Sequence, residues 1–331
     1  MNATINLENK HFPVLLNELV SIISPLYGGT FIDCTFGQCG YSEKILEHKK
    51  NDIIALDRDK EVLNNTLKLQ KKYKERFKFY NLKFSQLDQI KLKNNKIKGI
   101  IFDLGYSLNQ IKNSQKGLSF SDKGKLNMRM GLNDFSANEI ISNMDENNLA
   151  KVFKVFGDEK YSKKIAKKIV EKRKDKTIKT EDLVQIIDNV KKYQKTKIHN
   201  STKVFQALRI LVNKEISELI NALVNSFTLI PIGGIIVVVT FNSIEDKIVK
   251  FFFKHYSEQR NSSRYLPEIE LSEKCFNLIN KKPILPSNSE IRQNPPSRSA
   301  KLRYGIKIND KCNFTEFRKK FKNLTDVEAL R

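Results

Sequence analysis

The segment that decides the fold reads Thr30-Phe-Ile-Asp-Cys-Thr-Phe-Gly-Gln-Cys-Gly40. A short apolar run ends in Asp33, and two glycines, Gly37 and Gly40, follow before a helical pattern begins. Glycine lets the backbone turn sharply and come close to a ligand, as the strand-to-helix loop of a nucleotide-binding sheet requires. The segment therefore predicts the first strand, the ligand-binding loop and the first helix of an α/β domain.

The segments that follow alternate in the same way between strands and helices. Further strands are expected at residues 52–56, 77–82 and 97–102, and helical patterns lie around residues 43–47 and 60–74. Strands that alternate with helices predict a mostly parallel, Rossmann-like sheet with right-handed crossovers.

The strand pattern stops between about residues 113 and 202. Apolar residues recur there at helical spacing, as in Leu149, Val152, Phe153 and Phe156. The sequence therefore predicts an inserted, all-helical domain at residues 113–202.

The α/β pattern resumes after this insert. A long amphipathic helix is expected from residue 202, and residues 235–241 are typical of a fully buried strand. Two more strands are expected near residues 276–281 and 301–308. We therefore expect a discontinuous sheet domain made of residues 1–112 and 203–331.

The chain is basic, with 60 Lys and Arg residues against 37 Asp and Glu and a net charge of +23. Such a balance favours a polyanionic partner, of which nucleic acid is the first candidate. The alternative is a basic, solvated surface that binds no partner.

The cysteines and the apolar runs indicate a protein of the reducing cytoplasm. Cys34, Cys39, Cys275 and Cys312 are too few and too scattered for a disulfide framework, and none belongs to a CxxC pair. The N-terminus lacks the apolar core of a signal peptide, and the longest apolar run, Ile235 to Val239, is too short to span a bilayer. We therefore expect a soluble protein without a membrane partner.

The second predicted strand ends in Leu56-Asp57-Arg58-Asp59, which places Asp57 20 residues after Gly37. A carboxylate at this position can accept hydrogen bonds from both ribose hydroxyls of a nucleoside. A dinucleotide fingerprint would need a glycine where Thr35 stands, so a pyrophosphate ligand is disfavoured. S-adenosylmethionine has no phosphate and carries a positive sulfonium, which makes an acid such as Asp33 favourable near the loop. We therefore expect this cofactor; the alternative is a glycine turn beside a solvated acid.

The fourth predicted strand ends in Asp103-Leu-Gly-Tyr106, at the sheet edge where open α/β folds bind ligands. Methyltransferases that act on exocyclic amines carry an acid or amide here, then a short turn and often an aromatic residue. A methyltransferase that acts on a cytosine ring carbon needs a cysteine nucleophile, and no cysteine occurs between Cys39 and Cys275. We expect Asp103 to accept a hydrogen bond from the amine and Tyr106 to stack on the base or close the pocket.

Longer motifs lie in order along nearly the whole chain. They are His11-Phe-Pro-Val-Leu-Leu-Asn-Glu18, Asp33-Cys-Thr-Phe-Gly37, Asp57-Arg-Asp59, Asp103-Leu-Gly105 with Gln110, Gly117-Leu-Ser-Phe120, Leu126-Asn-Met-Arg-Met130, Phe205-Gln-Ala-Leu-Arg-Ile210 with Asn213 and Glu215, Ser243-Ile-Glu-Asp246 and Arg298-Ser-Ala-Lys-Leu-Arg303. On these motifs the chain resembles the MraW (RsmH) family. These class I S-adenosylmethionine-dependent methyltransferases methylate the exocyclic N4 of a decoding-centre cytosine in bacterial 16S ribosomal RNA.

The resemblance implies a cofactor pocket and a substrate. With Gly37, the pocket would contain Cys39, Gly40, Tyr41, Asp57, Phe84, Asp103 and Gln110. Gln206 and Arg209, which are polar within an apolar stripe, become candidates for lining the substrate cleft. The implied partner is 16S ribosomal RNA in small-subunit particles, and the oligomeric state is left open.

Lysine and histidine residues supply the remaining candidates. A basic face on a predicted helix of the insert carries Lys163, Lys164, Lys167 and Lys168. We expect these lysines to contact RNA phosphates, the alternative being a solvated helix face. His11 and His199 are isolated beside polar loop sequence, so no metal site is expected.

Four positions in three motifs depart from the family's usual residues: Cys39, Tyr41, Asn127 and Asn242. The family's Gly-Gly-His-Ser reads Cys39-Gly40-Tyr41-Ser42, its Leu-Asp-Met-Arg-Met has Asn127, and its Phe-His-Ser has Asn242. Neither asparagine is expected to transfer a proton. Two alternatives stay open: a methyltransferase for another RNA or DNA base, and a ribosome-assembly binding protein that retains the fold without turnover.

Overall fold

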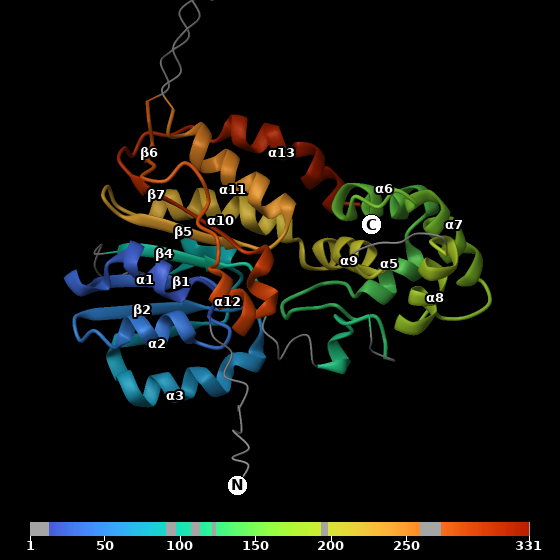
Figure 1. The fold of residues 1–331 in the computed structure, drawn as a ribbon, viewed down its shortest axis with the longest axis horizontal. Coiled ribbons are helices and arrows are strands. Elements are labelled where there is room, and N and C mark those ends of the chain that lie inside the picture. The colour runs from blue at the N-terminus through green and yellow to red at the C-terminus, as the bar shows by residue number, and fades with distance from the viewer. Residues whose placement is uncertain are drawn as a thin grey trace, which may run out of the picture. The chain divides into compact units, whose positions relative to one another are not determined.

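A computed structural model describes residues 13–90, 97–106, 113–120, 124–192, 198–258 and 273–330 of the chain. Within these ranges, seven strands form one sheet in the order β3-β2-β1-β4-β5-β7-β6 (Figure 1). The strands are β1 (Gly29–Asp33), β2 (Asn51–Leu56), β3 (Phe77–Tyr80), β4 (Ile97–Asp103), β5 (Ile235–Thr240), β6 (Phe276–Asn277) and β7 (Lys301–Lys307). β1 to β5 run parallel, whereas β7 is antiparallel to both β5 and β6. The predicted α/β fold with a mostly parallel sheet is thus confirmed.

The register of the parallel strands brings their carboxyl ends to one edge. Asp33, the last residue of β1, pairs with Ala55 of β2 and with Ile101 of β4. Asp57 and Asp103 therefore follow within two residues of the positions that pair with Asp33. This edge is where an open α/β fold binds its ligand.

Helices cover both faces of the sheet. On one face, α1 and α2 pack with Phe31 and Ile101 into a core that also contains Tyr304. Side chains alternate along a strand, so Gly305 faces the other side, where an added Cβ would lie 2.8 Å from the Phe253 ring of α11. The helices around the sheet are α1 (Leu16–Ile23), α2 (Gly40–Leu46), α3 (Leu63–Tyr73), α11 (Ser243–His255) and α12 (Asn288–Gln293).

The chain forms two compact units. The first, which we call the sheet unit, comprises Met1–Asn81, Lys91–Leu108 and Ser226–Cys312. The second, the helical unit, comprises Leu82–Ile90, Asn109–Asn225 and Asn313–Arg331. Its helices are α5 (Ala137–Asn143), α6 (Glu146–Gly157), α7 (Ser162–Lys172), α8 (Thr180–Val190), α9 (Thr202–Asn213), the first part of α10 (Glu215–Leu229) and α13 (Thr315–Glu328).

This division differs from the boundaries expected from the sequence. The expected insert was 113–202, whereas the helical unit also takes residues 82–90, 203–225 and 313–331. The reason is packing, because both α9 and α13 pack against α6. The expected long helix after residue 202 is also two helices, since Lys214 between α9 and α10 has the left-handed φ of 51°. In the part of the chain that is described, no helix is long and apolar enough to cross a membrane.

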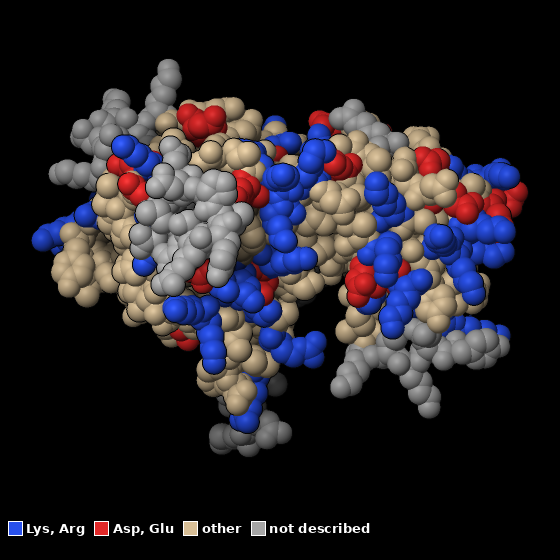
Figure 2. Space-filling view, turned by 90° about the horizontal axis from the view of Figure 1, so that it is seen from above, with Lys and Arg blue, Asp and Glu red and all other residues tan. Residues whose placement is uncertain are grey.

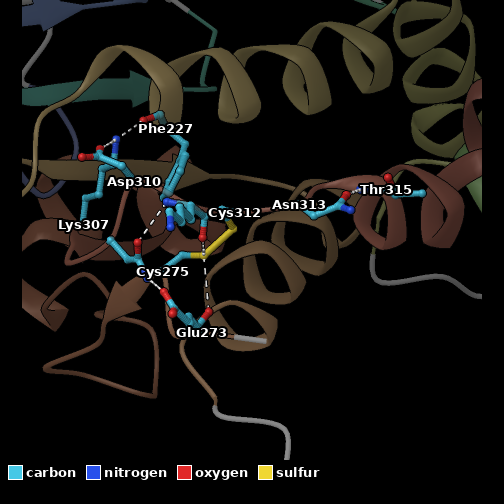
Figure 3. The surroundings of a disulfide bond; sticks show 10 residues. Phe227, Glu273, Cys275, Lys307, Asp310, Cys312, Asn313 and Thr315 are labelled. Atoms are coloured by element: carbon cyan, nitrogen blue, oxygen red, sulfur yellow. Dashed lines mark hydrogen bonds and ion pairs between the residues drawn. A yellow bond between two sulfur atoms is a disulfide. The ribbon is translucent and has the colours of Figure 1, made fainter. Parts of the chain in front are cut away.

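The C-terminal part of the sheet unit contains a disulfide between Cys275 and Cys312 (Figure 3). The sequence did not predict this bond, because 37 residues separate the two cysteines and no short spacing pairs them. Nearby, the buried Lys307 ammonium donates 2.8 Å hydrogen bonds to the carbonyl oxygens of Phe227 and Ile230. These bonds hold the end of β7 to the end of α10.

Candidate functional site

Three carboxylates gather at the carboxyl edge of the sheet. Asp33 ends β1, Asp57 follows β2, and Asp103 ends β4. Because the strand order is β2-β1-β4, the three acids lie on neighbouring strands. The sequence predicted this placement, and the contacts of each acid show how it is held.

Asp33 is fully buried beneath the loop that follows β1. Its Oδ1 accepts the N–H of Thr35 at 3.2 Å, and its Oδ2 accepts the Ser42 hydroxyl of α2 at 2.7 Å. Burial raises the pKa of Asp33 to about 6, against the lowering effect of these hydrogen bonds. Asp33 therefore fixes the loop and the first turn of α2, and it brings a negative charge close to the loop.

The loop is joined to the neighbouring strands by hydrogen bonds between backbone N–H groups and side-chain oxygens. Gly37 has a left-handed φ of 44°, and its N–H donates to Asp57 Oδ2 at 2.9 Å. The other oxygen of Asp57 accepts the N–H of Asp59 at 2.8 Å. On the β4 side, the Thr35 hydroxyl accepts the N–H of Asp103 at 2.7 Å. The loop is thus fixed at both sides before any ligand binds.

Asp103 is held by the turn that follows it and by Tyr41. Its Oδ1 accepts the N–H of Gly105 at 2.9 Å, and its Oδ2 lies 3.1 Å from the Tyr41 hydroxyl. The same hydroxyl lies 2.5 Å from the carbonyl oxygen of Val14, so one proton has two acceptors in reach. A side chain at Gly105 would lie 2.8 Å from the Phe241 ring, which explains the glycine in this turn. Tyr41 therefore directs one oxygen of the carboxylate.

The electrostatics of this edge favour a cationic ligand. Burial raises the pKa of Asp57 and of Asp103 to about 6, as it does for Asp33. No Lys, Arg or His side chain among the described residues forms an ion pair with any of the three. At neutral pH the three carboxylates thus carry negative charge that no described Lys, Arg or His side chain pairs with. The described residues also contain no cluster of three His, Cys, Asp or Glu that could hold a metal ion.

The other described residues of the predicted cofactor pocket belong to different units: Cys39 and Gly40 to the sheet unit, and Phe84 to the helical unit. Cys39 precedes α2 with a left-handed φ of 62°, and a Cβ at Gly40 would overlap the Pro13 ring. Cys39 is free and buried, and burial raises the pKa of its thiol to about 11. Phe84 belongs to the helical unit, at the start of a short 3-10 helix (Phe84–Gln89).

Tyr106 and Gln110 complete the set of predicted catalytic and cofactor-binding residues. Tyr106 is half-buried and follows the Asp103 turn. Gln110 and His11 lie outside the described residues. Their predicted roles, like those of the other candidate site residues, stay predictions.

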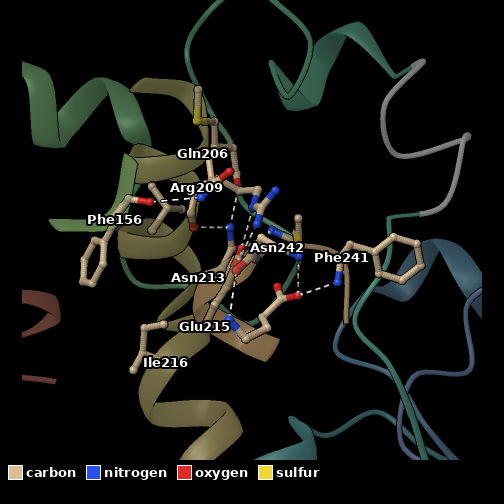
Figure 4. Close-up of polar contacts among 12 residues, drawn as sticks. Phe156, Gln206, Arg209, Asn213, Glu215, Ile216, Phe241 and Asn242 are labelled. Carbon is tan, nitrogen blue, oxygen red and sulfur yellow. Dashed lines mark hydrogen bonds and ion pairs between the residues drawn. The ribbon is translucent and has the colours of Figure 1, made fainter. Parts of the chain in front are cut away.

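The substrate candidates fall into two groups within the helical unit. One group is exposed on the outer face of α7 and comprises Lys163, Lys164, Lys167 and Lys168, while Ile165 and Ile169 are buried behind it. The other group has packing partners. Gln206 donates to the carbonyl oxygen of Phe156 at 3.0 Å, and Arg209 makes two hydrogen bonds of 2.8 and 2.9 Å to Glu215 (Figure 4).

Asn213 is a positioning residue that the sequence reasoning left without a role. It is fully buried, and its side chain donates to the carbonyl oxygens of Met128 and Arg209, both at 2.9 Å. Its oxygen accepts from the Met130 N–H at 3.1 Å and from Asn133 at 2.9 Å. Asn213 thus joins the 126–130 motif to α9. The sequence signal that could have indicated this role is a polar residue at the end of the apolar, buried stripe of α9.

The departing asparagines have local structural contacts. Asn127 Oδ1 accepts the Arg129 Nε–H at 2.8 Å. Asn242 precedes α11 and accepts the N–H groups of Ile244 and Glu245, both at 3.0 Å, as a helix N-cap does. These contacts need an acceptor oxygen and no titratable group.

Two late sequence motifs meet in the sheet unit. Asp246 of α11 accepts Arg303 Nε–H at 2.8 Å and Lys301 Nζ–H at 3.0 Å, both from β7. This pairing fixes α11 to the antiparallel strand. The ion pairs give Asp246, Lys301 and Arg303 a structural role in holding α11 on β7.

The family model and the relatives that match this chain agree on one family. The model of the MraW methylase family matches residues 8–308 of the chain. Ribosomal RNA small subunit methyltransferase H from Rickettsia bellii is 41% identical over 306 residues, which are 91% of this chain and 100% of that protein. The proteins of that name from Afipia carboxidovorans and Bartonella quintana are 37% and 38% identical, over 92% and 93% of this chain and 91% and 92% of theirs.

Solved structures are also similar, at low identity. An rRNA methylase from Streptococcus thermophilus has a TM-score of 0.38 at 10% identity, covering 88% of this chain and 96% of that one. The Streptococcus mutans protein SMU.1697c, in complex with SAH, has a TM-score of 0.39 at 12% identity, covering 88% of this chain and 97% of that one.

Proposed function

The chain belongs to the MraW methylase family, and on this basis we propose that it methylates the exocyclic N4 of a cytosine in the decoding region of bacterial 16S ribosomal RNA. Its cofactor is S-adenosylmethionine. The observation that carries the proposal is the family match over residues 8–308, with relatives named ribosomal RNA small subunit methyltransferase H. The proposal includes a cytoplasmic location, where small subunits are assembled.

The residues at the sheet edge fit this cofactor. When bound, S-adenosylmethionine supplies a methyl group on a positively charged sulfur. Asp33, Asp57 and Asp103 give the edge the negative charge that such a ligand favours. Asp57 has lone pairs left for ribose hydroxyls after it accepts two backbone N–H groups. A Cβ at Gly37 would meet no atom closer than 3.8 Å, so the loop leaves room above it.

The chemical task assigned to Asp103 follows from the substrate. The N4 amine of cytosine is a weak nucleophile because its lone pair is delocalised into the ring, so positive charge that develops on nitrogen needs stabilisation. Asp103 uses one lone pair for Gly105 and one toward Tyr41, which leaves two free to accept an N–H of the amine. With a pKa of about 6, the carboxyl is ionised at neutral pH and serves as that acceptor.

The hydrogen bonds around Asp103 preorganise its carboxylate as an acceptor for the amine. The backbone N–H of Asp103 and the Thr35 hydroxyl hold the strand end, and Tyr41 directs the second carboxylate oxygen. A charge held in place before the reaction costs no reorganisation during it. Tyr106, which follows Gly105 directly in the chain, is proposed to stack on the base or close the pocket.

The polymer is proposed to bind through phosphates as well as through the base. A base in folded RNA must be unstacked to reach the sheet edge. The exposed lysines of α7 are proposed to contribute phosphate contacts, which give affinity without sequence specificity. Gln206 and Arg209 of α9 are proposed, from the family resemblance, to contact the RNA substrate.

Mass spectrometry of 16S ribosomal RNA nucleosides tests the proposal. We expect N4-methylated cytidine to be lost from cells without this gene and restored by the wild-type gene, but not by one that encodes Asp103→Asn. An unchanged nucleoside profile would contradict the proposed substrate. Transfer of labelled methyl to another RNA or to DNA would then identify the polymer, and cofactor binding without any transfer would favour the non-catalytic alternative.

A further inference from the structure

The C-terminal helix α13 carries a cluster of positive charge that the proposed mechanism does not use. The helix belongs to the helical unit and packs against α6. It lies beyond residue 308, where the match to the family model ends. Its charges therefore lie outside the region matched by the family model.

The inner face of α13 is apolar and buried. Phe317 and Phe321 are 0% and 3% exposed, and their rings pack edge to face with centroids 5.6 Å apart. Val327, on the last turn, is also fully buried. The helix is thus held by its apolar side, and its opposite side faces water.

A carboxylate fixes the far end of the helix. Both oxygens of Glu328 accept backbone N–H groups from the first turn of α10, those of Ile216 and Ser217, each at 2.8 Å. These bonds cap a helix start with an acid from a distant part of the chain. The direction in which α13 presents its outer side is therefore fixed.

The outer side carries the basic face of α13, which comprises Arg318, Lys319, Lys320 and Lys322. All four residues are exposed. Arg318 donates to Asn221 at 2.8 Å, and Lys322 pairs with Asp326 at 2.8 Å. Lys319 and Lys320 have no ion pair within the described chain. Figure 2, seen from above, shows a band of Lys and Arg side chains in the region where α13 lies in Figure 1.

The neighbouring helix adds charge of the same sign. Lys151 and Lys154 of α6 are exposed, and Lys154 is 3.8 Å from Asp158. Exposed lysines on two helices that are in contact give positive charge that is complementary to a polyanion. An anionic membrane is disfavoured, because the apolar side of α13 is buried in the protein and cannot enter a bilayer.

We propose that the basic face of α13, with Lys151 and Lys154, binds the phosphate backbone of the RNA substrate as a contact surface additional to α7. This inference rests on the proposed function, because it takes the polyanion to be ribosomal RNA. Phosphate contacts add affinity and orientation but do not read sequence. The surface therefore acts on binding of the particle and not on methyl transfer within the bound complex.

The test is the double variant Lys319→Gln/Lys320→Gln, because neither lysine has a described partner whose loss would disturb the fold. We expect its Kd for small-subunit particles to rise roughly threefold to tenfold at about 0.1 M salt. The slope of log affinity against log salt should decrease in magnitude by about 1.4. Cofactor affinity and the rate at saturating particle concentration should not change.

The matched control is Lys247→Gln/Lys250→Gln, which removes two exposed lysines of α11 in the sheet unit. A salt slope unchanged in the α13 variant, or reduced equally in the control, would overturn the proposal. So would an unchanged RNA affinity combined with lost binding to anionic phospholipid vesicles. These outcomes are separate from failure of the proposed function, in which the wild-type protein would not methylate the particles.

Discussion

The carboxyl edge of the sheet and the outer helices of the helical unit carry charge in opposite ways. At the edge, Asp33 is buried, Asp57 and Asp103 are half-buried, and all three carboxylates are held by N–H or hydroxyl groups. On α7 and α13, exposed lysines extend into water. A fixed, desolvated charge acts strongly on a small ligand, whereas solvated charges add weakly and depend on salt. Substitutions at the edge should therefore have much larger effects.

The largest effect is expected from Asp103→Asn, which removes the charge and keeps the shape. The remaining oxygen can still accept the Gly105 N–H, and the new amide can donate to the Tyr41 hydroxyl, whose proton has Val14 as its acceptor. We expect single-turnover methyl transfer to slow by on the order of 10²–10⁴, while much of the cofactor affinity is kept. Labelled methyl transfer to small-subunit particles, with both substrates saturating, measures this step. Wild-type rates would make the carboxylate a structural residue.

A smaller loss, in binding rather than in rate, is expected from Asp57→Ala. The substitution removes the acceptor proposed for the ribose hydroxyls and also frees the Gly37 N–H. Affinity for S-adenosylmethionine should weaken by about 1–3 kcal/mol, measured by titration calorimetry. Asp57→Asn is the control, since it keeps one acceptor oxygen for the loop. Unchanged affinity in Asp57→Ala would move the cofactor site away from this edge.

Raising the pH should lower the folding stability that the three carboxyl groups contribute in the ligand-free protein, and it should raise the affinity for S-adenosylmethionine. The pKa of Asp33, Asp57 and Asp103 is about 6, above the ordinary 3.8, because burial disfavours the charge. A raised pKa means that the folded state holds more protons than the unfolded state between about pH 4 and 6. The stability that these groups contribute is therefore present below about pH 4 and is lost as pH rises through about 6.

Cofactor binding should show the reverse trend, because a cation favours the ionised carboxylates. As pH falls below about 6, affinity for S-adenosylmethionine should decrease by up to about tenfold per pH unit for each linked proton. The neutral-sulfur product, S-adenosylhomocysteine, should lose less affinity. Calorimetry of both ligands between about pH 5 and 8 makes the comparison. Parallel profiles would show that the carboxylates do not interact with the sulfonium charge.

The same contrast explains what the sequence could predict. The strands of the sheet were predicted because buried parallel strands such as Ile235–Thr240 are continuous β-branched runs. The acids at their ends were predicted because parallel strands bring equivalent positions to one edge. The roles of Thr35 and Ser42 were missed, since short hydroxyl side chains carry no periodic signal. Their bonds to Asp103 and Asp33 appear only once the loop is folded.

The helical unit was predicted less completely because its limits depend on distant contacts. Glu328 bonds to Ile216 across 112 residues, and no local pattern indicates that α13 joins this unit. The break at Lys214 was also missed, because the apolar spacing of α9 continues into α10. The disulfide between Cys275 and Cys312 has the same explanation, a contact between residues 37 apart.

The smallest effects per residue are expected on α7, from replacing Lys163, Lys164, Lys167 and Lys168 by Gln. Three of these lysines have no ion pair within the described chain, whereas Lys168 pairs with Glu171 at 2.7 Å. The KM for small-subunit particles should rise roughly threefold to tenfold, because each solvated lysine adds little affinity. The salt slope should decrease in magnitude by about 2–3, since each phosphate contact releases counterions.

The α7 variant should change binding of the particle and leave the rate of methyl transfer unchanged, whereas Asp103→Asn should change the rate. Ile165 and Ile169 bury the inner side of α7, so the four substitutions leave its packing intact. Cofactor affinity and kcat should therefore stay at wild-type values, in contrast to Asp103→Asn. Replacing Lys71, Lys74, Lys247 and Lys250 of the sheet unit by Gln removes the same charge and serves as the control. If both quadruple variants change the salt slope equally, the net charge of the protein governs RNA binding, and α7 is an ordinary solvated helix face.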